Sequence, residues 1–80
     1  MNNAPMVPHA LRLLWAKRLR EARSRSGLTV EVAARSAGLT VEGLKAVELG
    51  CVLTHATVIE RLARRYGVEV SWLVSPNPEA

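Results

Sequence analysis

Apolar side chains recur every three or four residues along most of the 80-residue chain, which is the spacing of amphipathic helices. The first such stretch runs from about His9 to Ser24, and Gly27 lies just past its end. Its inward-facing residues are Leu11, Trp15, Leu19 and Ala22. Little of the chain shows the alternation that a sheet would need, so the pattern predicts an all-helical bundle.

Two shorter apolar stretches follow, and Gly38 separates them. Thr29 and Thr40 stand where a helix-capping side chain is expected, and Gly50 closes the second stretch. The inward residues of this pair are Ala33, Ala34, Ala37, Leu44 and Val47. Small alanines and a glycine at the corner let two helices cross closely at a steep angle. This is the geometry of a helix-turn-helix, the unit that places a helix in the major groove of DNA.

A fourth helix is predicted from Thr54 or His55 to Tyr66. Its inward residues are Ala56, Ile59, Leu62, Ala63 and Tyr66. A short fifth helix, with Ser71 as its cap, is predicted to end at Val74.

The length allows one domain with one small core, and a hydrophobic content of 49% favours a globular chain over a disordered one. We expect this domain over residues 9–75. Residues 1–8 are expected to be a flexible N-terminal tail, and residues 76–80, where Pro76 and Pro78 end regular structure, a C-terminal tail. A core of this size lies near the limit of stability, which favours dimerisation.

The net charge of +4 favours a nucleic-acid partner, but the charge is unevenly distributed. Residues 11–25 hold six basic residues and one glutamate. Residues 29–49, the predicted helix pair, hold two basic residues and three glutamates. The expected reading unit is therefore slightly acidic.

A set of residues at fixed spacings supports a more specific interpretation. They are Arg23, Gly27, Leu28, Thr29, Ala34, Gly38, Leu39, Thr40, Leu44, Val47, Glu48 and Gly50, followed by Leu62, Ala63, Gly67, Val68 and Leu73. With these residues, the stretch from about Trp15 to Val74 resembles, without a gap, the Cro/C1-type (XRE) helix-turn-helix family of phage repressors and small bacterial regulators.

The resemblance implies an all-α, lambda-repressor-like DNA-binding domain, a compact bundle of four main helices plus a short fifth. Residues 41–49 would form the recognition helix, and two-fold homodimers are frequent in the family. An arginine late in the first helix and a glutamate late in the third, here Arg23 and Glu48, would form a structural ion pair. The function implied is that of a small transcriptional regulator, such as a repressor, on double-stranded DNA.

Family positions and nearby basic residues give a set of candidate DNA contacts: Thr29, Val30, Thr40, Val41, Glu42, Gly43, Lys45, Ala46, Arg18, Arg20 and Arg25. Lys45 suits guanine, and Val41 suits a thymine methyl group. Glu42 could accept from a cytosine amino group, although solvated charge is the better interpretation for it. The three arginines could contact phosphates beside the groove, or could form a solvated face.

Several of these positions depart from the family. Where it usually has a phosphate-gripping glutamine, this chain has Val30, and the residues after Glu48 are mostly apolar. The alternative function is therefore a helix-turn-helix scaffold reused as a protein-binding antiactivator or antirepressor. Its candidate interface is Val30, Val41, Leu49, Cys51, Val52, Leu53 and Trp72. A structural role is equally compatible: these side chains could tuck into the core, with Trp72 as its lid.

We expect no enzyme, because no two residues form a convincing acid/base or nucleophile pair and the chain is too small to enclose a substrate pocket. No metal or cofactor is expected: His9 and His55 are isolated, and the single Cys51 excludes an internal disulfide. The sequence shows neither a signal peptide nor an apolar run of membrane-spanning length, so a cytoplasmic location is expected, with no membrane or small-molecule substrate as partner.

Overall fold

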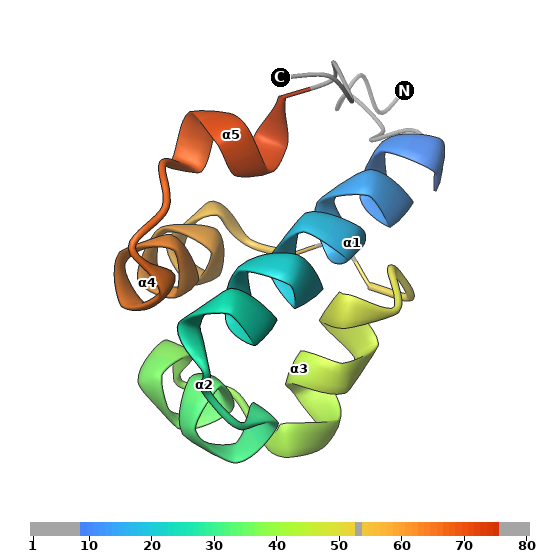
Figure 1. Cartoon of the computed structure of the whole chain (residues 1–80). Helices are drawn as coiled ribbons and strands as arrows, with labels where there is room; N and C mark the ends of the chain where they lie inside the picture. Colours follow the sequence, from blue (N-terminus) through green and yellow to red (C-terminus); the bar gives the residue numbers. More distant parts are fainter. Residues whose placement is uncertain (1–8, 53, 76–80) are drawn as a thin grey trace.

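The computed structural model describes residues 9–52 and 54–75, and within them all regular secondary structure is helical. The helices are α1 (His9–Ser26), α2 (Val30–Ala37), α3 (Val41–Glu48), α4 (Ala56–Tyr66) and α5 (Val70–Val74). Figure 1 shows α1 running diagonally across the molecule, with α2 and α3 below it and α4 and α5 to its left. The predicted all-α bundle of four main helices and a short fifth is confirmed.

The ends of α2 and α3 follow from local chemistry. The hydroxyl of Thr29 accepts a hydrogen bond from the Val32 amide, and that of Thr40 accepts one from the Gly43 amide. Gly38 ends α2 with φ of +73°, a left-handed conformation that costs glycine little. The chain can therefore turn within three residues and begin α3.

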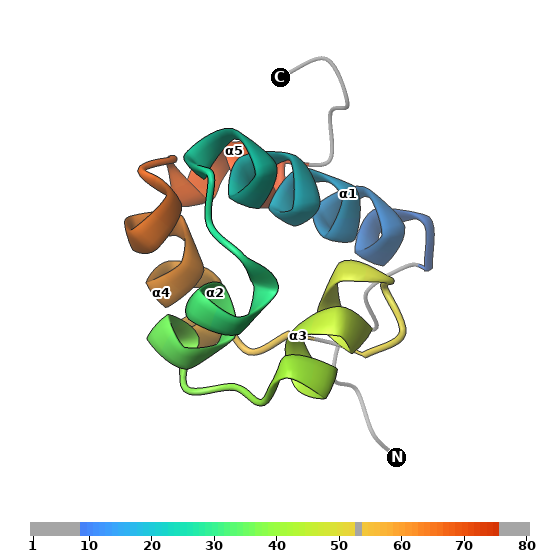
Figure 2. The ribbon, with the colours of Figure 1, turned by 60° about the horizontal axis from the view of Figure 1, so that its bottom comes forward.

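The core draws on every helix: Leu19, Ala22, Ala33, Ala34, Ala37, Leu44, Val47, Ile59, Leu62, Ala63, Tyr66 and Leu73. Helix α2 contributes only alanines to it, so α2 can pack closely against both α3 and α4. Figure 2 shows α2 lying between these two helices. Among the described residues, no helix is long and apolar enough to cross a bilayer.

Three details of the sequence prediction are wrong. Helix α1 extends to Ser26, and α5 begins at Val70 after Glu69, whose carbonyl accepts the Trp72 and Leu73 amides, so Ser71 is not the cap. Ala56 is exposed, because it is the first residue of α4 and precedes the part of the helix that meets the core. The segments 1–8 and 76–80, predicted to be tails, lie outside the described residues.

Candidate nucleic-acid interface

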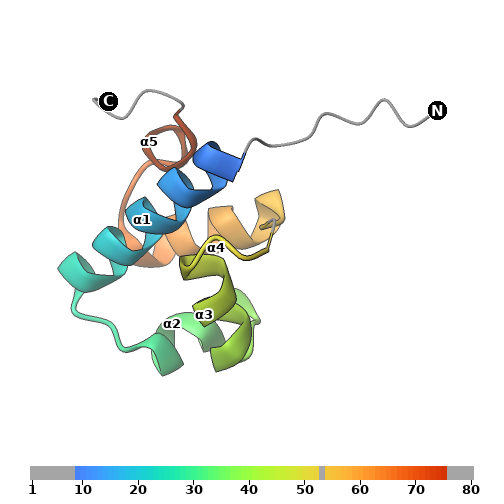
Figure 3. The same ribbon diagram turned by 90° about the vertical axis from the view of Figure 1, so that its right-hand side faces the viewer.

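Helix α3 is held by one face and open on the other. It buries Leu44, Val47 and Glu48, whereas Glu42 and Lys45 are exposed. In Figure 3, α2 and α3 lie together at the lower end of the molecule, with α1 and α4 above them. This arrangement leaves one side of a well-anchored helix accessible to a partner.

Two arginines of α1 anchor the C-terminal end of α3. Arg23 Nε lies 2.7 Å from Glu48 Oε2, and Arg23 Nη2 donates to Glu48 Oε1 at 3.0 Å, which makes a bidentate pair. The Glu48 side chain is only 7% exposed, and the bond to it raises the pKa of Arg23. Arg20 Nη1 donates to the Glu48 backbone carbonyl. The pair that the family resemblance implies is thus present in the structure.

The buried side chain of Tyr66 lies close enough to this ion pair for the two charges to affect its pKa. Burial and the charge of Glu48 raise the pKa of Tyr66 to about 12, and Arg23 opposes part of that rise. The Tyr66 hydroxyl has no hydrogen-bond partner among the described residues. Tyr66 therefore stays neutral through the physiological range.

The candidate DNA contacts fall into three groups by exposure. Thr29, Thr40, Glu42, Lys45, Arg20 and Arg25 are exposed, whereas Val30, Val41, Gly43 and Ala46 are half-buried. The two threonine oxygens accept the capping bonds, but each hydroxyl proton remains available to a phosphate.

Arg18 alone makes up the third group, the buried one, and its prediction as a phosphate contact is wrong. It is buried, and its Nη1 donates to the carbonyls of Trp72 at 2.8 Å and Ser75 at 2.6 Å. Its guanidinium also lies 5.8 Å from the centre of the Trp72 ring. Arg18 therefore fastens α5 to α1 and is not available to a phosphate. Trp72 is half-buried against the core, the position expected of a lid.

The three most exposed large apolar residues belong to a region beside the end of α3. Leu49 is 63% exposed and Val52 is 45% exposed, and Cys51 between them is also exposed. Leu13 of α1, which is 44% exposed, lies against Gly50: a Cβ on that glycine would stand 2.9 Å from Leu13 Cδ2. We call Leu13, Leu49, Cys51 and Val52 the apolar patch. Leu53 lies outside the described residues, and Val30 packs against the core.

Sequence reasoning missed Leu13. Leu13 lies outside the apolar stripe of α1 that contains Leu11 and Trp15. An apolar residue outside that stripe was the signal that could have indicated an exposed contact surface. Its position against Gly50 depends on how α1 and α3 pack, which the pattern of either helix alone does not show.

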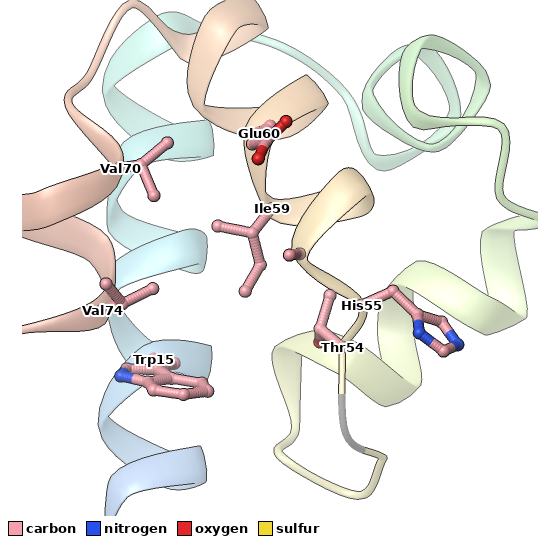
Figure 4. Close-up of a pocket in the computed structure, with 8 residues that line it drawn as sticks. Trp15, Thr54, His55, Ile59, Glu60, Val70 and Val74 are labelled. Carbon is pink, nitrogen blue, oxygen red and sulfur yellow. The ribbon is translucent and has the colours of Figure 1, made fainter.

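A second apolar feature is a groove of 590 Å³ between α1, α4 and α5. In Figure 4, Trp15, Ile59 and Val74 face a common space, and His55 points away from it. Its volume lies in the range of small-molecule sites, which the sequence did not lead us to expect. No group of three histidine, cysteine, aspartate or glutamate residues that could hold a metal occurs among the described residues.

A compact helical bundle in which two capped helices meet at a left-handed glycine, with the second helix exposed, has the architecture of a helix-turn-helix domain. A sequence model described as "Helix-turn-helix domain" matches residues 16–71, and the chain belongs to this family.

The structure is similar to the crystal structure of a hypothetical transcription factor, NHTF, from Neisseria. The two are 29% identical with a TM-score of 0.77, and the match covers 99% of this chain and 92% of the other. No curated protein is significantly similar in sequence.

Proposed function

We propose that the protein is a DNA-binding transcriptional regulator of the Cro/C1 type, which inserts α3 into the major groove. The observation that carries the proposal is the anchoring of α3 by the Arg23–Glu48 pair, with Glu42 and Lys45 left exposed on its outer side. Membership of the helix-turn-helix family and likeness to a hypothetical transcription factor support it.

The proposed contacts combine a few charges with the starts of two helices. Thr29 and Thr40 cap α2 and α3, whose N-terminal amides carry partial positive charge and favour phosphates. Lys45, Arg20 and Arg25 supply the positive side chains. With about three such contacts, the logarithm of the binding constant should fall with the logarithm of salt concentration with a slope of about −3. Binding is therefore expected to be weak, and less salt-dependent than that of proteins that make about 6–10 phosphate contacts.

We further propose a homodimer on a two-fold site, acting as a repressor by occupying it. In such an arrangement the two α3 helices stand about 34 Å apart, one turn of DNA, so that both read the same face of the duplex.

The test is fluorescence anisotropy with labelled duplex DNA at about 50 mM salt, where phosphate contacts are strongest. Lys45→Gln should weaken binding and Glu42→Gln should strengthen it, each about fivefold, because one charge near a phosphate is worth about 1 kcal/mol. Lys17→Gln, which removes the same charge as Lys45→Gln from an exposed position of α1 outside the proposed contacts, is the control and should leave the affinity unchanged. Absence of binding by the unmodified protein would contradict the proposal.

The apolar patch supports a second candidate, a protein-binding module such as an antiactivator or antirepressor. Leu13, Leu49 and Val52 are large apolar side chains with 44–63% of their surface exposed, and monomers seldom leave such patches without a partner. Val41, half-buried at the start of α3, would contribute to the same interface.

This candidate predicts that Leu49→Asp or Val41→Asp abolishes self-association or partner binding while circular dichroism shows the fold intact. Val32→Asp, on the exposed side of α2 and outside the patch, is the control. Sedimentation of all three variants measures the effect on self-association. If neither Leu49→Asp nor Val41→Asp changes association, the patch is not an interface.

A further inference from the structure

A positively charged surface, separate from the proposed α3 contacts, lies on α4 and the C-terminal end of α2. Its side chains line a hollow of 380 Å³ and are Ser36, Arg61, Arg64 and Arg65. We call these residues the arginine surface. Arg35 precedes Ser36 in the last turn of α2 and adds a further exposed positive charge nearby in the chain.

None of these arginines is neutralised within the described residues. Among the described residues, the ion pair joins Arg23 of α1 to Glu48 of α3 and involves none of these arginines. No carboxylate lines the hollow. Glu60 and Glu69 line an adjoining hollow that shares Arg64, without forming an ion pair with it. The arginine surface therefore carries a concentrated positive charge that an anion would stabilise.

Part of this surface is held in place by the fold. Arg61 Nη1 reaches across to the Ala37 carbonyl at the end of α2, at 3.5 Å, and lies 3.3 Å from the position of a Cβ on Gly38. Arg64 and Arg65 are exposed one turn further along α4. The three arginine side chains thus belong to one helix, α4, and Arg61 also contacts the end of α2.

The chemistry and spacing of the surface fit a nucleic-acid backbone. Guanidinium groups are planar, permanently charged and suited to two-pronged bonds with phosphate. Arg61 and Arg65 are separated by about 6 Å along the α4 axis, and one DNA strand advances about 3.4 Å per phosphate. Phosphates two steps apart along one strand, about 7 Å, could therefore meet Arg61 and Arg65, whereas a single small anion would leave part of the surface unused.

The location separates this surface from α3. Figure 2 shows α4 on the opposite side of α2 from α3, and the arginines belong to α4. The α2–α3 unit over residues 29–49 has more glutamates than basic residues, so its charge does not account for the protein's net charge of +4. The arginine surface is therefore a source of positive charge separate from the proposed α3 contacts.

We propose that the arginine surface binds the phosphate backbone of a second DNA segment, which lets one protein molecule bridge two duplexes. Bridging rests on the proposed function of α3, whereas binding at the arginine surface does not.

The experiment compares two variants that lose equal charge, one from the arginine surface and one from the proposed contacts around α3. Arg64→Gln/Arg65→Gln alters the arginine surface, and Arg25→Gln/Lys45→Gln alters the proposed α3 contacts. All four residues are exposed, so both variants should fold, which circular dichroism checks. Energy transfer between donor- and acceptor-labelled random duplexes reports bridging, and anisotropy of one duplex in excess protein reports binding of the first segment.

The proposal predicts that Arg64→Gln/Arg65→Gln lowers bridging about tenfold, keeps first-segment affinity within about twofold, and reduces the salt slope of bridging by about 2. Unchanged bridging in this variant, or equal effects of both variants on both readouts, would overturn it. Loss of all binding in Arg64→Gln/Arg65→Gln, with unchanged binding in Arg25→Gln/Lys45→Gln, would make the arginine surface the first DNA site; it would reject the α3 proposal and overturn bridging. Binding of polyglutamate at this surface without any bridging of DNA would identify an acidic protein as the occupant and overturn the assignment to DNA.

Discussion

At the scale of single residues, Glu48 has the most consequential position. It receives two bonds from Arg23, and its carbonyl accepts a third from Arg20, all linking α1 to α3. Removing the carboxylate leaves the Arg23 guanidinium, only 24% exposed, without its partner. An unpaired, partly desolvated charge of this kind costs about 2–4 kcal/mol.

Glu48→Ala should therefore unfold at a clearly lower denaturant concentration and temperature than the unmodified protein. Glu42→Ala is the matched control, because Glu42 lies on the exposed side of the same helix and should change the free energy of unfolding by less than about 1 kcal/mol. Equal melting temperatures for the unmodified protein and Glu48→Ala would show that the pair contributes nothing.

Tyr66 makes a prediction about alkaline pH. Burial raises its pKa from 10.0 to about 12, so in that interval the unfolded chain loses the phenol proton and the folded protein keeps it. The contribution of Tyr66 to stability is complete below pH 10 and is lost as the pH rises towards 12. Tyr66→Phe should make the free energy of unfolding less dependent on pH in this interval.

The same substitution should cost little at neutral pH, since the hydroxyl that it removes is buried without a partner among the described residues. Urea denaturation at a series of pH values, on both proteins, measures the two effects. An identical slope between pH 10 and 12 in both would show that Tyr66 titrates normally.

At the scale of elements, α2 and α4 end in the same way but in different surroundings. Gly38 and Gly67 have φ of +73° and +72°, and in each case the following amide donates back to the helix. A Cβ would meet Arg61 Nη1 at 3.3 Å on Gly38 and nothing within 4 Å on Gly67. The two glycines therefore form a matched pair.

Gly67→Ala should cost about 1–2 kcal/mol, the penalty for an alanine in the left-handed region. Gly38→Ala should cost slightly more, because Arg61 Nη1 must also shift by a few tenths of an ångström, which disturbs its 3.5 Å bond to the Ala37 carbonyl. In an Arg61→Ala background the two glycine substitutions should cost the same. Chemical denaturation of Gly38→Ala and Gly67→Ala, each with and without Arg61→Ala, measures this. A difference that persists without the Arg61 side chain would assign it to another cause.

The sequence predicted most of these elements because their signals are local. Thr29 and Thr40 cap the helices they precede, and Gly38 takes the left-handed conformation expected of it. The start of α5 was wrong because Ser71 suggested a cap, whereas the cap position is Glu69, two residues earlier. Local patterns determine that a helix exists better than they determine its first residue.

At the scale of the whole molecule, the sequence could not show contacts between distant parts of the chain. The charge distribution of the sequence suggested that Arg18 lies on an exposed basic face. Arg18 is instead buried, because it bonds to carbonyls 54 and 57 residues away. The apolar patch likewise depends on Leu13 and Gly50 meeting. The family resemblance suggested the Arg23–Glu48 pair but gave no indication of the arginine surface.

The measurement that tests the central claim most directly is a titration of the isotope-labelled protein with random duplex DNA at about 50 mM salt, following the backbone amides by NMR. If α3 is the recognition helix, the largest shifts will fall on residues 40–46 and at the start of α2, around Thr29 and Val30. Unchanged amides throughout these two segments, even with shifts along α4, would contradict the claim that α3 meets DNA.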